Sequence, residues 1–259
     1  LTGFSGTILL LCGDTPLLTG KTLEKLFAEH KQSNAAATVL TAVPSDATGY
    51  GRILRDASGQ VLGIVEQKDA TEEQKRIGEI NTGIYCFEAA PLFAALAGLT
   101  CNNAQGEYYL TDVLAIMAET GNRVGAVSVE DFQETLGINS RVQLAEAETL
   151  LRRRKLIELM ENGVTVMDPA STFVDAAVSI GQDTILYPCT WIEGATTIGR
   201  DCRIGPNTRI ADSQIGDAVT LHFSYAHECK IGEGVTVGPY AHLRPDTELL
   251  AGVKVGNFV

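Results

Sequence analysis

The chain has 259 residues, 45% of them hydrophobic, which is enough apolar material for one or two packed domains. Its net charge of −12 and pI of about 4.8 argue against nonspecific binding to nucleic acid or anionic lipid, because both need basic surfaces. No apolar run approaches the ~20 residues of a membrane-spanning helix, and no signal peptide opens the sequence. The sequence begins without Met, in what reads as the middle of a domain, so we expect a fragment.

Cysteine usage indicates a reducing compartment. The six cysteines form no C-x-x-C pair, and most lie in apolar runs. This is typical of buried, reduced thiols in a cytosolic protein rather than of disulfides or a zinc site. The cysteines are Cys12, Cys86, Cys101, Cys189, Cys202 and Cys229.

The first 140 residues alternate strand-like and helix-like patterns, which favours a mostly parallel sheet covered by helices. In chain order they predict a strand at 8–12, a helix at 22–30, a strand at 36–43, a hairpin of 51–56 and 60–66, a strand at 82–87 and helices at 91–96 and 110–118. Ligands of such sheets bind beyond the carboxyl ends of the strands. Asp14 follows the first strand, and Asn81 opens the strand at 82–87, so both are candidate site residues.

A helix is predicted from Ser140 to Glu161, with Ser140 as its cap. From about Asp168 the pattern changes, and apolar residues recur every six positions, most of them followed by glycine. This hexapeptide repeat predicts four to five triangular coils of ~18 residues, with the apolar residue inside and the small residue at the corner. The phased positions are Ile180, Leu186, Ile192, Ile198, Ile204 and Ile210, then, after a slip of register, Ile231, Val237, Leu243, Leu249 and Val255.

Six motifs carry a resemblance to a known family. They are, in order, LCGDTPLL, TGYGRILRD, GIVEQKDAT, EINTGIYCF, NAQGEYYLTD and LGINSRVQLAEAE. They resemble the uridylyltransferase domain of the bacterial bifunctional N-acetylglucosamine-1-phosphate uridylyltransferase / glucosamine-1-phosphate acetyltransferase. The hexapeptide half, ending YAHLRPDTELLAGVKVGNFV, resembles the start of that family's left-handed β-helix.

The resemblance implies an α/β fold: a Rossmann-like nucleotidyltransferase domain at 1–139, a helical linker at 140–163 and a partial left-handed β-helix acetyltransferase domain at 164–259. It implies Mg²⁺ held by Asp14 and Asn139, with Cys12 and Gly13 bordering the uridine-sugar site, where the family usually has an aromatic residue in place of Cys12. Substrate contacts are implied for Gly51, Glu66 and Asn81, and for Arg244 in the acetyltransferase site.

The resemblance also implies what lies outside the chain. The family's glycine-rich loop would lie before Leu1, and its acetyltransferase histidine would lie beyond Val259, so no catalytic residue for acetyl transfer is expected within the chain. We therefore expect these 259 residues alone to be inactive. The implied substrates are UTP, acetyl-CoA and sugar phosphates; the implied assembly is a homotrimer through the β-helix, in the bacterial cytoplasm, without nucleic acid or membrane insertion.

Two other readings stay open on the sequence. The chain could belong to a different sugar-1-phosphate nucleotidyltransferase whose β-helix serves only assembly. It could also be a non-catalytic assembly module. For the individual residues, Asp14 could be a turn cap, Glu66 a solvent-facing hairpin residue and Asn81 a residue bonded to local backbone.

Overall fold

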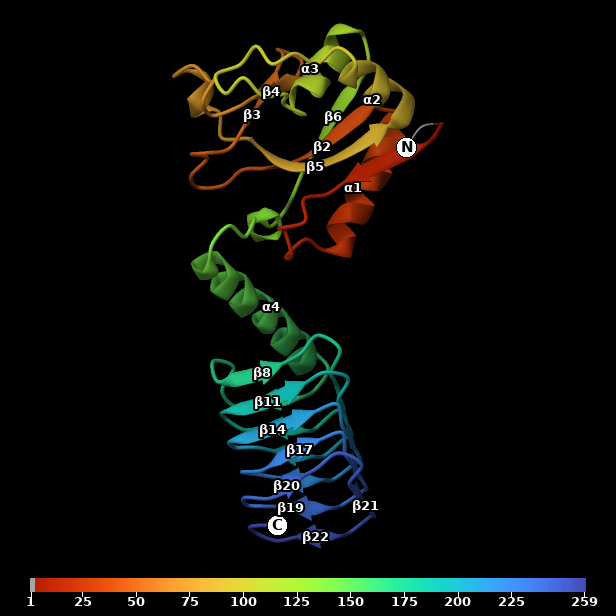
Figure 1. Ribbon diagram of the computed structural model, residues 1–259, viewed down its shortest axis with the longest axis vertical. Coiled ribbons are helices and arrows are strands. Elements are labelled where there is room, and N and C mark those ends of the chain that lie inside the picture. Colours follow the sequence, from red (N-terminus) through yellow and green to blue (C-terminus); the bar gives the residue numbers. More distant parts are fainter. Residues whose placement is uncertain (1–2) are drawn as a thin grey trace. The chain divides into compact units, whose positions relative to one another are not determined.

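The computed structural model describes residues 3–259, which form two compact units, one ending at Leu144 and the other spanning Ala145–Val259 (Figure 1). The first is an α/β sheet unit and the second a parallel β-helix. This confirms the predicted fold class. No helix in the described part of the chain is long and apolar enough to cross a membrane.

The sheet unit alternates strands and helices, as the sequence pattern predicts. Two short 3-10 helices lie at Gln74–Arg76 and Phe132–Thr135. The remaining elements are β1 (Thr7–Leu10), α1 (Gly20–Ser33), β2 (Ala37–Ala42), β3 (Arg52–Arg55), β4 (Val61–Val65), β5 (Ile80–Glu88), α2 (Ala89–Leu96), α3 (Asp112–Glu119) and β6 (Val124–Ser128).

The strand directions differ from the expected mostly parallel sheet. The order is β4-β3-β5-β2-β6, with β1 also pairing β5. Among the described strands of this sheet, only the β2–β6 pair is parallel; β1, β2 and β3 each run antiparallel to β5. Strand direction is set by pairing between distant segments, and alternation along the chain does not report it.

Helices cover both faces of this sheet because neighbouring strand residues point to opposite sides. On one side, Leu26 of α1 packs with Leu40 and Ile84. On the other, α2 and α3 pack against a second cluster that includes Val39 and Phe87. All six residues of β2 are buried, as expected for a central strand between two helical layers.

Helix α4 (Arg141–Glu161) confirms the predicted helix and its cap. The Gln143 N–H donates to Ser140 Oγ at 3.2 Å. At its far end, Leu156 and Leu159 are part of the β-helix core, so the helix closes one end of that core.

The second unit stacks short strands into three parallel sheets (Figure 1). One sheet holds β7 (Thr165–Val166), β10 (Ile185–Leu186), β13 (Arg203–Ile204), β16 (Thr220–Leu221), β19 (Thr236–Val237) and β22 (Lys254–Val255). The second holds β8 (Thr172–Val174), β11 (Thr190–Glu193), β14 (Thr208–Ala211), β17 (Tyr225–His227) and β20 (His242–Leu243). The third holds β9 (Ser179–Ile180), β12 (Thr197–Ile198), β15 (Gln214–Ile215), β18 (Lys230–Ile231) and β21 (Glu248–Leu249).

The slip of register in the sequence is a shortening of individual coils. The partners along one ladder are 18, 17, 16 and 18 positions apart: Ile180, Ile198, Ile215, Ile231 and Leu249. The apolar ladder stays in register, so the missing residues are taken from the corners.

Glycine after the apolar residue is required for space. A Cβ on Gly181 would lie 2.7 Å from the carbonyl carbon of Gly199, and one on Gly199 would lie 2.7 Å from that of Gly216. Adjacent coils therefore approach too closely at this corner for any side chain, which confirms the role predicted for the small residue.

The cysteines are less uniformly buried than expected. Cys86, Cys202 and Cys229 are buried, and Cys12 is half-buried. Cys101 and Cys189 are exposed, because both lie outside the apolar runs, in a loop and at a β-helix corner.

Candidate functional site

Asp14 and Asn139 lie side by side, although they are far apart in the sequence. A Cβ built on Gly137 would lie 3.2 Å from Asp14 Oδ2 and 3.8 Å from Asn139 Nδ2. Asp14 Oδ2 and Asn139 Nδ2 are therefore at most 7.0 Å apart, which is the sum of these two distances. The Ile138 N–H donates to the Asp14 carbonyl at 2.9 Å, which fastens the two segments together. Both side chains are exposed.

Local hydrogen bonds hold this pair of turns. After β1, the Thr15 hydroxyl donates to the Cys12 carbonyl at 2.9 Å. Before α4, the Asn139 N–H donates to Gln143 Oε1 at 2.7 Å. The Asp14 side chain is exposed, so its carboxylate can be reached by a ligand.

Gly51 and Glu66 form a second part of the site, directly before β3 and directly after β4. A Cβ on Gly51 would lie 2.9 Å from Ile64 Cγ2 and 3.3 Å from Glu66 Oε2, so only glycine leaves this carboxylate in place. Thr111 is buried and donates to Glu66 Oε1 at 3.1 Å. The Glu66 side chain is half-buried, and its hydrogen bond from Thr111 fixes the orientation of the carboxylate.

Asn81 joins this second part through its backbone and its side chain. Its N–H donates to the Gly51 carbonyl at 2.9 Å. Its Oδ1 accepts from the Gly83 N–H at 3.0 Å and from the Tyr85 hydroxyl at 2.9 Å. β5 runs antiparallel to β1, with Leu10 opposite Tyr85, so the start of β5 lies beside the turn that carries Asp14.

Cys12 connects the two parts. Its thiol donates to the Gly83 carbonyl at 3.4 Å, and it precedes Asp14 by two residues. Burial, and then the negative charge of Asp14, raise the pKa of Cys12, so the thiol stays protonated at neutral pH. Gly13 is exposed, with no atom within 4 Å of its Cβ position, which leaves open space at the site.

The structure thus gathers seven of the eight residues expected at the two sites into one region of the sheet unit: Cys12, Gly13, Asp14, Gly51, Glu66, Asn81 and Asn139. Tyr85 and Thr111 also belong there and were missed from the sequence. Tyr85 had a signal, because Asn81, Gly83 and Tyr85 alternate on one face of a strand. Thr111 lies in the motif NAQGEYYLTD, but no local pattern linked it to Glu66, since the two residues come from different elements.

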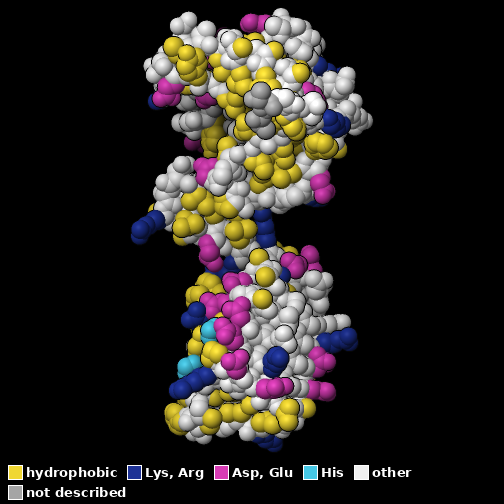
Figure 2. Space-filling model, turned by 45° about the vertical axis from the view of Figure 1, so that its right-hand side comes forward, with side chains coloured by type: hydrophobic (Ala, Val, Ile, Leu, Met, Phe, Trp, Pro, Cys, Tyr) yellow, Lys and Arg dark blue, Asp and Glu magenta, His cyan; other side chains and the backbone are white. Residues whose placement is uncertain are grey.

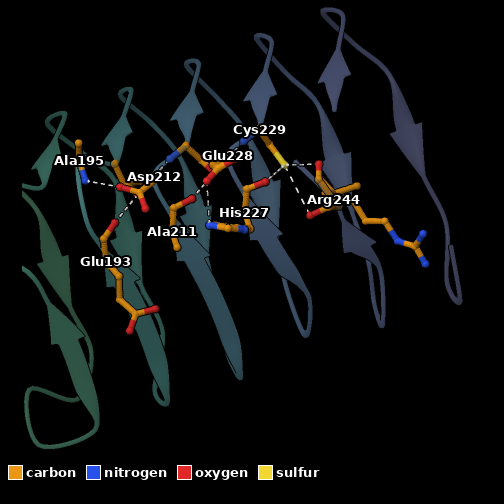
Figure 3. Close-up of polar contacts among 11 residues, drawn as sticks. Glu193, Ala195, Ala211, Asp212, His227, Glu228, Cys229 and Arg244 are labelled. Atoms are coloured by element: carbon orange, nitrogen blue, oxygen red, sulfur yellow. Dashed lines mark hydrogen bonds and ion pairs between the residues drawn. The ribbon is translucent and has the colours of Figure 1, made fainter. Parts of the chain in front are cut away.

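Arg244 lies in the β-helix unit and is exposed. Figure 3 shows its side chain pointing away from the other residues drawn. Its carbonyl accepts from the Cys229 thiol at 3.4 Å and the Thr247 hydroxyl at 2.6 Å, so the backbone is anchored while the guanidinium is free to reach a ligand. The neighbouring histidines have local contacts: His227 faces Glu228 at 3.4 Å, and His242 stacks on Tyr225.

A polar loop lies near Glu66. The Ala104 N–H donates to Asp69 Oδ1 at 2.9 Å, and the backbone N–H groups of Asp69 and Ala70 donate to the Glu66 carbonyl. The loop and the turn that follows Glu66 are therefore connected through hydrogen bonds of Asp69.

Figure 2 shows basic side chains only singly on the face in view, without a continuous basic patch.

Comparison with known proteins gives the family. The nucleotidyl transferase family matches residues 1–163. The bifunctional protein GlmU of Heliobacterium modesticaldum is 57% identical over 253 residues, covering 98% of this chain and 55% of that protein. That of Pelotomaculum thermopropionicum is 54% identical over 259 residues, covering 100% of this chain and 57% of that protein.

A third relative is similar over a comparable stretch. The bifunctional protein GlmU of Geobacillus sp. (strain WCH70) is 52% identical over 254 residues, which is 98% of this chain and 55% of that protein. The chain thus spans about half the length of the curated relatives it matches. With the family match over the sheet unit and the site residues brought together there, the chain belongs to the nucleotidyl transferase family.

Proposed function

We propose that this chain is part of an enzyme that makes UDP-N-acetylglucosamine. One half transfers a uridylyl group from UTP to N-acetylglucosamine 1-phosphate, and the other transfers an acetyl group from acetyl-CoA to glucosamine 1-phosphate. The observation that carries the proposal is the convergence of Asp14 and Asn139 beside Glu66 and Asn81. The similarity to proteins named bifunctional protein GlmU supports it.

The donor set fits a magnesium ion. Mg²⁺ prefers oxygen ligands at about 2.0–2.1 Å and keeps several waters, so few protein ligands suffice. Asp14 would give a carboxylate oxygen, and Asn139 its Oδ1 after a rotation of the amide, since Nδ2 is the atom nearer Gly137. The described residues hold no group of three or more His, Cys, Asp or Glu side chains suited to a metal. A bound Mg²⁺ would neutralise the charge that develops between the two phosphates.

The reaction needs no general base from the protein. The second pKa of a phosphate monoester is about 6, so the sugar phosphate is mostly dianionic at neutral pH and can attack the α-phosphorus directly, with pyrophosphate leaving. What the chain must supply is position. Asp14 and Asn139 serve the phosphates, while Glu66 accepts from sugar hydroxyls and Asn81 donates to an oxygen of the sugar.

In the β-helix half, we propose that Arg244 binds the phosphate of the amino sugar, since a guanidinium pairs with phosphate through two hydrogen bonds. We propose a homotrimer assembled through the β-helix and a place in the bacterial cytoplasm, where UTP and acetyl-CoA are available.

The test is Asp14→Asn in the complete protein, meaning this chain with its native flanking sequence. We expect Mg²⁺-dependent uridylyl transfer, followed as pyrophosphate release, to fall by at least 100-fold, because the metal loses its only charged protein ligand. Acetyl transfer, followed as free CoA, should remain unchanged. Loss of both activities in a folded variant would contradict this division of labour. A preference for glucose 1-phosphate over N-acetylglucosamine 1-phosphate would favour a different sugar nucleotidyltransferase.

A further inference from the structure

The Asn81 amide has only one orientation compatible with its neighbours. A backbone N–H is always a donor, so the Asn81 atom 3.0 Å from the Gly83 nitrogen must be the oxygen. The Tyr85 hydroxyl lies 2.9 Å from the same oxygen and must therefore donate to it. Two donors on Oδ1 direct the amide nitrogen to the other side.

Tyr85 is itself well fixed. It is 2% exposed and stacks on Phe87 with ring centroids 5.3 Å apart. Burial raises its pKa far above the ordinary value of 10.0, so the hydroxyl keeps its proton and stays a donor at any working pH. The Asn81 side chain is only half-buried, and the hydrogen bonds that the described residues make to its amide are both at Oδ1.

We propose that Tyr85 is a positioning residue that, with the Gly83 N–H, fixes the Asn81 amide so that its nitrogen faces the sugar nucleotide. This rests on the proposed function. Asn81 then presents two N–H donors, and the ligand must offer an oxygen acceptor there. Glu66, oriented by Thr111, presents acceptors and takes a hydroxyl. Asn81 and Glu66 would thus select a sugar that offers an acceptor to the amide and a hydroxyl donor to the carboxylate. An amide that rotated freely could present either its oxygen or its nitrogen and would not select in this way.

The experiment uses the complete protein with Tyr85→Phe, which keeps the stacking on Phe87 and removes one hydroxyl. We expect calorimetric binding of UDP-N-acetylglucosamine to weaken about 3- to 10-fold, in line with the loss of one hydrogen bond. The KM for N-acetylglucosamine 1-phosphate should rise by a similar factor, and the KM for UTP should not change. The matched control is Tyr187→Phe, which loses a hydrogen bond to Arg203 in the β-helix and should leave both constants unchanged.

Testing Tyr85→Phe in the Asn81→Ala protein distinguishes a positioning role of Tyr85 from a general effect on the structure. If Tyr85 acts through Asn81, Tyr85→Phe will have no further effect on binding in the Asn81→Ala protein. An equal weakening in both backgrounds, or unchanged binding by Tyr85→Phe alone, overturns the proposal while leaving the proposed function standing. If Asn81→Ala binds the sugar nucleotide as tightly as the unaltered protein, the assignment of the site itself fails.

Discussion

Gly137 lies between the two side chains expected to hold the metal, and its lack of a side chain sets their spacing. A methyl group there would come within 3.2 Å of Asp14 Oδ2, closer than most carbon–oxygen contacts in proteins. A side chain at this position would therefore require the Asp14 carboxylate to shift by a few tenths of an ångström.

Gly137→Ala tests this spacing. We expect the Mg²⁺ concentration for half-maximal uridylyl transfer to rise about 3- to 10-fold, because the added methyl displaces the carboxylate. Gly20→Ala is the matched control, since nothing lies within 4 Å of its Cβ position. An unchanged Mg²⁺ dependence would show that the carboxylate moves without consequence.

Thr111 offers a second test at this scale. Thr111→Val keeps the shape and leaves Glu66 Oε1 without its donor, so we expect the KM for the sugar phosphate to rise about 3-fold or more with little change for UTP. Thr111→Ser keeps the hydroxyl and should behave like the unaltered enzyme. If both variants match the unaltered enzyme in steady-state kinetics, the hydrogen bond has no role.

The residues of the site differ in how far the sequence revealed them. Asp14 and Asn139 were named together through the family resemblance, because no local pattern links a turn after one strand with a residue before a distant helix. Thr111 reaches Glu66 from the start of α3, and such a contact exists only once the chain is folded.

At the scale of the elements, local chemistry fixed the helices and distant pairing fixed the sheet. The α4 cap and the β3–β4 hairpin follow from residues adjacent in sequence, and both were predicted. Strand β6 was missed, and the sheet was expected to be mostly parallel. The presence of β6 and the strand directions both depend on which distant strands pair. That pairing is determined by how the strands bury apolar side chains on both faces of the sheet.

Glu88 joins three elements and predicts an acid-sensitive contact. Its Oε1 accepts from Lys31 of α1 and from Thr7 of β1, both at 2.8 Å, and faces the buried His30 at 3.2 Å. The Lys31 hydrogen bond, then that of Thr7, lower the pKa of Glu88 from 4.5 to about 2.

The sign follows from linkage. A depressed carboxyl pKa stabilises the fold above pH 4.5 and loses this stabilisation as the pH falls towards 2. We expect Glu88→Gln to flatten the pH dependence of the free energy of unfolding in this window, measured by urea unfolding. Burial lowers the pKa of His30 below 6.5, so its effect begins at higher pH and remains in the variant. An unaltered slope between about pH 5 and 2 would contradict the assignment.

The glycine corner of the β-helix gives a prediction for stability. Gly199→Ala places a methyl group against Asp217 Oδ1 and 2.7 Å from backbone of the next coil, so we expect a loss of about 2 kcal/mol or more of unfolding free energy. The control is Gly20→Ala in the sheet unit, which meets no atom within 4 Å and should be nearly neutral. Thermal unfolding followed by circular dichroism compares the two; equal melting temperatures would refute the steric argument.

At the scale of the whole molecule, the described residues form separate apolar cores. One core lies inside the β-helix and includes Leu156 of α4, and the others lie on the two faces of the sheet. The change from alternating elements to a six-residue period was visible in the sequence, since each period reports its own kind of packing.

Separate cores predict separate unfolding transitions. Ile204→Ala and Leu40→Ala each remove a fully buried side chain, and each should cost about 2–5 kcal/mol. We expect calorimetry to show two transitions, with Ile204→Ala lowering only that of the β-helix and Leu40→Ala only that of the sheet unit. A single transition shifted equally by both changes would show that the units unfold together.

Coils of 16, 17 and 18 residues stack in the same β-helix without disturbing its inner ladder. Axial length therefore depends on the number of turns and not on the number of residues, at roughly 4.8 Å per turn. Insertions and deletions at a corner are tolerated without displacing the layers above and below. Related chains are consequently best aligned through their inward-pointing isoleucines, leucines and valines. An alignment that assumes 18 residues in every coil goes out of register after the first shorter coil.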